Sequence, residues 1–394
     1  MTIKLSARVQ AVKPSPTLAI TARAAELRAA GKDVIGLGAG EPDFDTPDHI
    51  KKAAVKAIRD GQTKYTPVDG TPGLKRAVVE KFRRENDLAY ELDQILVSCG
   101  GKQSFYNLAQ ALLDPRDEVV IPAPYWVSYP DMVLLAGGVP VFINAGPAQR
   151  FKITPQQLKA AINGKTRMVV INSPSNPTGM TYTRDELAAL GQVLEEHPRI
   201  IVATDDMYEH IRWSDEPFVN IVNVCPELKE RTMVLNGVSK AYSMTGWRIG
   251  YAGGPAELIK AMKKIQSQST SNPASISQAA AQAALEGPQA CIQTMLAAFK
   301  ERHDYVVDRL NTLPGVSCLP TDGTFYCFPG VQDALLRLKG VKNDLEFAEH
   351  LIEKAGVALV PGSAFGLNGH ARISIATSME NLEKALDRIA KVLK

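Results

Sequence analysis

Long apolar runs and paired cysteines are missing from this chain of 394 residues. No stretch approaches the roughly 20 apolar residues that a membrane-spanning helix needs, and the first fifteen residues lack the apolar centre of a secretion signal. The five cysteines lie far apart without a CxxC pair, which favours buried, reduced thiols over disulfides or a zinc site. We therefore expect a cytoplasmic protein that makes no contact with membranes.

Charge of one sign and metal-ligand spacing are also scarce. The net charge is +3 without a block of like charges, which argues against nucleic acid as a partner. None of the six histidines lies at metal-ligand spacing from another, so we expect no catalytic metal. The chain also has neither a GxSxG elbow nor a GxxxxGK[ST] phosphate loop.

The pattern of apolar residues predicts an α/β protein. Beyond residue 90, amphipathic stretches alternate with short β-branched runs, namely ILVSC, VVIP, VPVFIN, MVVIN, IIVAT and MVLN. This alternation predicts a mainly parallel sheet with helices on both faces. From about residue 290, a long helix, short strands and a final helix capped by Ser378 indicate a smaller α+β part. We expect a large domain over residues 46–290 and a small domain formed by residues 1–45 and 291–394.

Polar side chains follow several of the predicted strands. Asn176, Asp205 and Lys240 each come just after an apolar run, and open parallel sheets bind ligands beyond the carboxyl ends of their strands. We therefore expect all three to face one crevice. Lys240 is the most informative, because a buried lysine is costly and tends to lose its charge. A neutral amine is a nucleophile towards carbonyl groups.

Other loops offer groups that suit a flat, phosphorylated ligand, and each has a purely structural alternative. Gly100 and Gly101 either bind an anion at a helix start or form a tight turn. Trp126 either stacks on a ring or packs in the core. Arg248 is expected to grip phosphate, whereas Arg372 either holds a carboxylate or lies at a solvated edge.

The same two-sided interpretation applies to the polar residues that follow the strands. Asp205 either pairs with a protonated ring nitrogen, with Tyr208 as a second donor nearby, or caps a helix. Asn176 either points its amide at a ring oxygen or forms a turn before Pro177. An amine, an acid for a ring nitrogen, a stacking aromatic and a phosphate grip together describe pyridoxal phosphate, which carries an aldehyde and an electron-accepting ring.

Ordered blocks along nearly the whole chain resemble the class I pyridoxal-phosphate aminotransferases of fold type I. The similarity is greatest to the Ib subgroup of bacterial aspartate aminotransferases. The blocks are GAGEPDFDTP, KYTPVDGTPGLK, GGKQ, PYWVSYP, NSPSNPTG, DDMYEH, SKAYSMTGWRIGY and RISIATS.

The resemblance implies a role for each site residue. Lys240 forms the Schiff base with the cofactor and shuttles the substrate proton, Asp205 pairs with the pyridine nitrogen, and Tyr208 bonds the ring oxygen. The other implied cofactor contacts are Gly100, Gly101, Lys102, Trp126, Asn176, Ser239 and Arg248. The implied substrate contacts are Gly40, Trp126, Asn176 and Arg372, of which Arg372 holds the α-carboxylate. Tyr65 reaches the phosphate of the neighbouring subunit, which implies a homodimer with shared active sites.

Two positions bear on the phosphate and on substrate choice. Many relatives have a hydroxyl residue three before the lysine, where this chain has Gly237, so one phosphate donor must come from elsewhere. In the Ib subgroup the lysine of GGKQ, here Lys102, is thought to bind the distal carboxylate of the substrate. Thr17 and Lys102 also resemble residues that are tied to the use of prephenate.

We therefore expect a ping-pong aminotransferase that moves the amino group of L-aspartate or glutamate to 2-oxoglutarate or oxaloacetate. The alternatives are a bifunctional aspartate/glutamate–prephenate aminotransferase, or one of broader or aromatic specificity. β-Elimination or decarboxylation on the same scaffold is a rival, because a fold does not fix its chemistry. A cofactor-sensing regulator is a more distant rival, because the predicted fold begins about 20 residues from Met1 and leaves too little chain for a DNA-binding domain.

Overall fold

The computed structural model describes residues 3–14 and 16–394, with the side chains of residues 16–18 left out. Its centre is a seven-stranded sheet in the order β2-β8-β7-β6-β5-β3-β4. The strands are β2 (Ile95–Ser98), β3 (Glu118–Ala123), β4 (Val139–Asn144), β5 (Thr166–Asn172), β6 (Ile201–Asp205), β7 (Thr232–Gly237) and β8 (Gly250–Gly253). Only β8 runs antiparallel to its neighbours, so the predicted mainly parallel sheet is confirmed.

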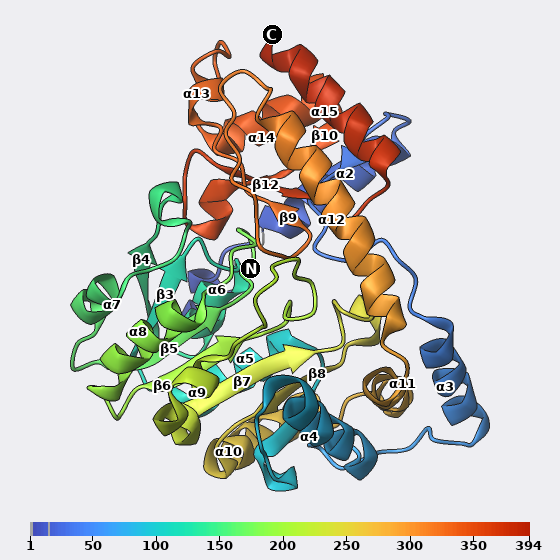
Figure 1. The fold of residues 1–394 in the computed structure, drawn as a ribbon, viewed down its shortest axis with the longest axis vertical. Coiled ribbons are helices and arrows are strands. Elements are labelled where there is room, and N and C mark those ends of the chain that lie inside the picture. The colour runs from blue at the N-terminus through green and yellow to red at the C-terminus, as the bar shows by residue number, and fades with distance from the viewer. Residues whose placement is uncertain (1–2, 15) are drawn as a thin grey trace.

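Helices cover both faces of this sheet (Figure 1). They are α3 (Asp48–Arg59), α4 (Pro72–Asn86), α5 (Gly101–Leu112), α6 (Ser128–Leu135), α7 (Pro155–Ala161), α8 (Arg184–Glu195), α9 (Ile221–Val224), α10 (Ala256–Ser267) and α11 (Ser275–Glu286). Successive strand residues point to opposite faces. Val169 and Ile171 therefore pack with α4, α8 and α11, whereas Met168 and Val170 pack with α5, α6 and α10.

Most of the remaining elements form a smaller part at the top of Figure 1. Its helices are α2 (Pro16–Ala29), α12 (Ala290–Leu310), α13 (Gln332–Leu335), α14 (Asp344–Lys354) and α15 (Met379–Leu393), whereas the short helix α1 (Ala7–Ala11) packs against α6. Its strands are β1 (Ile35–Gly36), β9 (Tyr326–Cys327), β10 (Val357–Ala358), β11 (Val360–Pro361) and β12 (Ala371–Ser374). Ser378 caps α15 as predicted, accepting from the Asn381 amide.

One strand pairing joins segments from near the two ends of the chain in this smaller part. β1 pairs in parallel with β10, so residues near the start lie against residues near the end. Helix α12 runs from the smaller part down towards α11 (Figure 1). These arrangements support the predicted division into residues 46–290 and residues 1–45 with 291–394, whose boundaries stay a prediction.

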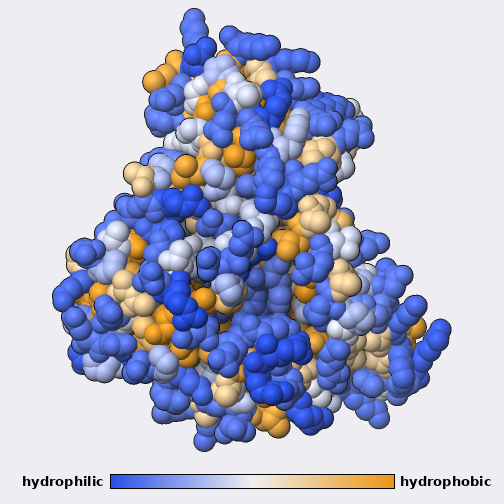
Figure 2. Space-filling model, in the orientation of Figure 1, coloured by the Kyte–Doolittle hydropathy of each residue, from blue (hydrophilic) through white to orange (hydrophobic). Residues whose placement is uncertain are grey.

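The face of the molecule drawn in Figure 2 is mostly polar. Figure 2 shows a largely hydrophilic face on which hydrophobic residues form only small, separate patches. Within the described part of the chain, no helix combines the length and the apolar character that crossing a membrane requires.

Candidate active site

A cavity of about 380 Å³ lies beyond the carboxyl ends of β5, β6 and β7 and is closed on its far side by residues of the smaller part. Its wall gathers most of the residues that the sequence predicts for the site. These are Gly40, Gly101, Lys102, Trp126, Asn176, Asp205, Tyr208, Ser239, Lys240, Arg248 and Arg372. Convergence on one crevice is the outcome expected for an open parallel sheet.

Neighbouring strands bring Asn176 and Asp205 together. β5 and β6 are paired in parallel so that Asn172 lies opposite Asp205. The Asn172 side chain donates to the Asp205 carbonyl oxygen at 2.9 Å and accepts from the Asn176 amide at 2.9 Å. One side chain thus holds the loop after β5 against the end of β6.

Lys240 follows β7 and projects its amine into the cavity. Its Nζ donates to the Gly40 carbonyl oxygen at 2.5 Å. Burial, and then the positive charge of Arg372, lower the pKa of Lys240 from 10.5 to about 8. A substantial share of this amine is therefore uncharged in mildly alkaline solution, which is the state that attacks a carbonyl carbon.

Asp205 faces the same cavity from the end of β6. Its Oδ2 accepts from the Tyr129 hydroxyl at 2.5 Å, and its Oδ1 accepts from the Met207 amide at 3.3 Å. Burial raises the pKa of Asp205, while these two donors and the nearby Lys240 oppose the rise. A protonated ring nitrogen beside this carboxylate would offset the remaining cost of its charge.

Arg372 enters from β12 of the smaller part and is only 2% exposed. Its guanidinium donates to Asn176 Oδ1 at 2.9 Å and to the Gly38 carbonyl oxygen at 2.8 Å. The Nε atom has no hydrogen-bond partner among the described residues. Arg372 is therefore an inward-facing cation with donor capacity to spare, and the alternative of a solvated edge is wrong.

The start of α5, at Gly100 and Gly101, carries no side chains. Gly100 has φ +89°, and a Cβ added there would lie 2.4 Å from Arg248 Nη2. Gly250 on β8 allows the same close approach, because its Cβ would lie 2.2 Å from the Gly101 nitrogen. The helix N-terminus and the Arg248 guanidinium thus approach each other closely in the wall of the cavity, where both favour an anion.

Packing is tight around Gly237. A Cβ at Gly237 would lie 3.0 Å from Gly250 Cα and 3.1 Å from the Ile249 carbonyl oxygen. Strand β8 would therefore have to move by a few tenths of an ångström to admit serine or threonine at this position. Ser239, which lies in the cavity wall and is 5% exposed, stands nearer the lysine.

Lys102 lines the cavity beside Trp126, whereas Tyr65 is not among the residues that line it. Lys102 lies at its rim, with Nζ 5.3 Å from the centre of the Trp126 ring, and burial and the Arg248 charge lower the pKa of Lys102. Tyr65 is 92% exposed and lines a separate hollow of about 340 Å³. The side chain of Thr17 lies outside the described side chains.

Two aromatic residues of the site, Tyr326 and Tyr129, were not predicted from the sequence. Tyr326 on β9 places its hydroxyl 3.0 Å from that of Tyr208, and the Arg372 guanidinium lies 4.3 Å from its ring centre. Tyr129 bonds Asp205 as described above. The three-residue spacing from Trp126 to Tyr129 at the start of a helix was the available signal. Tyr326 had no comparable signal, because its neighbours in space come from distant segments.

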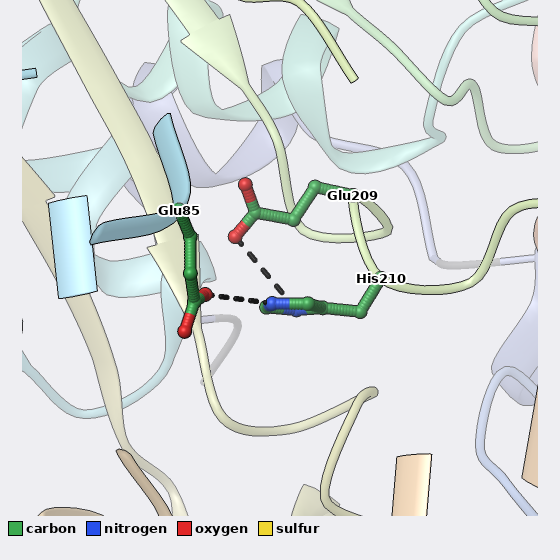
Figure 3. Close-up of side chains that lie close together, drawn as sticks. All are labelled: Glu85, Glu209 and His210. Atoms are coloured by element: carbon green, nitrogen blue, oxygen red, sulfur yellow. Dashed lines mark hydrogen bonds and ion pairs between the residues drawn. The ribbon is translucent and has the colours of Figure 1, made fainter. Parts of the chain in front are cut away.

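A second polar cluster lies outside the cavity and contains Glu85, Glu209 and His210 (Figure 3). Their ligand-type atoms all lie within 4.8 Å of one another. The buried Lys81 ammonium forms an ion pair with Glu209 and lies 3.6 Å from Glu85. Arg84 also forms an ion pair with Glu85, so two cations of the chain balance the two carboxylates without a metal ion.

Comparison with known proteins shows the family of this chain. The family model for class I and II aminotransferases matches residues 32–389. The chain belongs to this family. Its members depend on pyridoxal phosphate, convert amino acids and 2-oxo acids, and are transferases.

Named relatives and solved structures agree along the whole chain. An aspartate/prephenate aminotransferase of Nitrosomonas europaea is 60% identical over 99% of this chain and 100% of its own. An aspartate aminotransferase of Geobacillus stearothermophilus is 51% identical over 99% of both chains. The structure of the Rhizobium meliloti aspartate aminotransferase has a TM-score of 0.96 at 50% identity, covering 100% of this chain and 99% of that one.

The residues of the cavity fit pyridoxal phosphate. The Lys240 amine suits the aldehyde, and the Asp205 carboxylate suits the ring nitrogen. The start of α5 and the Arg248 guanidinium, which line the same cavity, suit the phosphate. Each of the three chemical groups of the cofactor therefore has a counterpart in the wall.

Proposed function

We propose that this chain transfers the amino group of L-aspartate or L-glutamate to 2-oxoglutarate or oxaloacetate in two half-reactions. The observation that carries the proposal is the meeting of Lys240 and the buried Arg372 in one cavity. A guanidinium with free donor capacity suits the α-carboxylate that all these substrates share. It would hold the substrate Cα beside the amine.

A second cation supports dicarboxylic substrates. Lys102 lies at the rim of the same cavity, and its ammonium is available to a distal carboxylate. Attraction between such charges favours dicarboxylates over uncharged side chains. The structure of the Thermus thermophilus aspartate aminotransferase with maleate, a dicarboxylate, has a TM-score of 0.94 at 44% identity and covers 99% of this chain and 100% of that one.

Prephenate is the second candidate acceptor. The relative from Nitrosomonas europaea and one from Cereibacter sphaeroides, 56% identical over 98% of this chain and 97% of its own, are both named aspartate/prephenate aminotransferases. Prephenate also carries two carboxylates, so the cation pair that suits aspartate suits it as well. We propose that Thr17 and Lys102 bear on this choice.

We propose the following division of labour among the residues. Arg372 fixes the α-carboxylate, and Lys240 Nζ takes the proton from the substrate Cα and delivers it to the cofactor's C4′ carbon. Asp205 holds a proton on the ring nitrogen, and Tyr208 with Asn176 bonds the ring oxygen. When bound, pyridoxal phosphate supplies an electron-accepting ring for the charge left at Cα.

The remaining contacts complete this proposal. Trp126 covers one face of the ring, and Gly40 lines the substrate side of the cavity. Gly100, Gly101, Ser239 and Arg248 surround the phosphate, where the main-chain amides at the start of α5 supply donors. They would compensate for the hydroxyl that Gly237 cannot provide.

We further propose a homodimer in the cytoplasm. Tyr65 is 92% exposed and far from the cavity wall of its own chain, which supports a role at the phosphate of a neighbouring subunit. The five cysteines are all free thiols, which supports a reducing compartment. Sedimentation of the wild-type protein and of Tyr65→Ala would test the assembly, and titration of each apoenzyme with pyridoxal phosphate would test the cofactor affinity.

A single-turnover experiment tests the proposed reaction. The holoenzyme is mixed with L-aspartate alone, and the cofactor absorbance and the products are followed. One equivalent of oxaloacetate with the aminated cofactor is expected, and 2-oxoglutarate or prephenate should then restore the starting spectrum. Release of ammonia or carbon dioxide without the aminated cofactor would instead indicate elimination or decarboxylation.

A further inference from the structure

One hydrogen bond links the wall of the cavity to the carboxylate at its base. The Tyr129 hydroxyl donates to Asp205 Oδ2 at 2.5 Å. Tyr129 belongs to α6, whereas Asp205 ends β6, so the bond joins a helix on one face of the sheet to a strand end. The hydroxyl and the ring of Tyr129 are only 1% exposed.

Aromatic packing fixes the position of this hydroxyl. The Tyr129 ring lies 4.9 Å from the Phe105 ring centre and meets the Trp126 ring edge-on, at 5.2 Å and 89°. The Tyr129 amide also donates to the Trp126 carbonyl oxygen at 3.1 Å. The Tyr129 side chain therefore contacts both Trp126 and Asp205. A movement of Tyr129 would displace both residues.

We propose that Tyr129 is a positioning residue that keeps Asp205 ionised and aimed at the cofactor's ring nitrogen. This inference rests on the proposed role of Asp205. A neutral donor offsets part of the cost of a buried negative charge without cancelling that charge. A lysine or arginine in its place would satisfy Asp205 outright and leave less charge for the ring.

The surroundings make the hydroxyl a permanent donor. Burial and the adjacent Asp205 charge raise the pKa of Tyr129 well above its ordinary value, so it keeps its proton. Lys240 lowers the pKa of Asp205, and the Asp205 charge in turn raises the pKa of Tyr208 and of Asp206. Of these, only Lys240 offers positive charge, and it is the residue proposed to bind the cofactor.

Removing the Tyr129 hydroxyl would shift a proton from the cofactor's ring nitrogen towards Asp205. Without Tyr129, the Asp205 carboxylate becomes more basic and competes for the proton on the ring nitrogen. With less positive charge, the ring would draw fewer electrons from the double bond that joins the cofactor to Lys240. The nitrogen of that bond would therefore hold its proton more tightly. The absorbance change of the bound cofactor should then have its midpoint at higher pH.

The test compares Tyr129→Phe with the wild-type holoenzyme and with Tyr182→Phe. Tyr182 is a matched control, because it is a buried tyrosine whose hydroxyl accepts from the Ile153 amide at 3.0 Å instead of bonding Asp205. For Tyr129→Phe we expect a higher absorbance midpoint, weaker binding of pyridoxal phosphate to the apoenzyme, and a kcat lower by about 10- to 100-fold. Thermal unfolding of each apoenzyme reports whether the fold is kept.

The Tyr129→Phe substitution made in an Asp205→Asn background separates the role of Tyr129 from the role of Asp205. There, Tyr129→Phe should cause little further change in the midpoint, because the charge it serves is gone. An unchanged midpoint in Tyr129→Phe alone, or an equal shift in Tyr182→Phe, would overturn the role of Tyr129. An unchanged midpoint in Asp205→Asn would overturn the role of Asp205 itself.

Discussion

The lysine at the centre of the site should destabilise the apoenzyme. Burial and Arg372 lower the pKa of Lys240 from 10.5 to about 8, which corresponds to an upper limit of about 3 kcal/mol for charging the folded state. The bond from Lys240 to the Gly40 carbonyl oxygen returns part of this. Lys240→Met should therefore raise the free energy of unfolding of the apoenzyme by about 1–3 kcal/mol at pH 7.

The difference in unfolding free energy between Lys240→Met and the wild type should change with pH in a defined direction. Below pH 8 the lysine is charged in both states and the full cost is present. Between about pH 8 and 10.5 the unfolded state binds more protons than the folded one, so wild-type stability rises relative to the variant. The advantage of Lys240→Met should thus be largest near pH 7 and shrink towards pH 10.

Urea unfolding of the stripped apoenzyme at several pH values is the assay. Lys260→Met, at an exposed position of α10, is the control and should show no such pH-dependent difference. A variant at Lys240 that is less stable at pH 7, or whose gain stays constant with pH, would refute the reasoning.

Three further predictions concern the carboxylate, the rim cation and the packed glycine. Asp205→Asn should lose about 3 kcal/mol of transition-state stabilisation in steady-state kinetics with aspartate, and near-normal turnover would contradict its role. Lys102→Ala should raise the KM for aspartate about 10-fold more than that for an aromatic amino acid; equal losses would remove Lys102 from substrate choice. Gly237→Ser should lower apoenzyme stability by about 1–3 kcal/mol, because its Cβ would lie 3.0 Å from Gly250 Cα; an unchanged Tm would contradict this.

The central strands and their polar ends were predictable from the sequence. β5, β6 and β7 are buried on both faces, so they appear as continuous apolar runs. Parallel pairing then requires their carboxyl ends to meet, which places Asn176, Asp205 and Lys240 in one cavity. Strand β8, with the sequence GYAG, was missed because its two glycines give no β-branched signal.

Long-range contacts could not be predicted from local pattern. Arg372 meets Asn176 across 196 positions of the chain, whereas its own neighbours in the sequence favoured a solvated edge. Only the resemblance to a family placed it inside the site. Tyr65 has no partner in the cavity of its own chain, so its proposed role depends on a second subunit that the sequence describes only by resemblance.

The account depends most on the bond between the cofactor and a single amine. Borohydride reduction of the holoenzyme, followed by peptide mapping, locates the pyridoxyl group directly. We expect one group per chain, on the peptide that contains Lys240. A pyridoxyl group on any other lysine, or none in the cofactor-loaded protein, would contradict the proposed site.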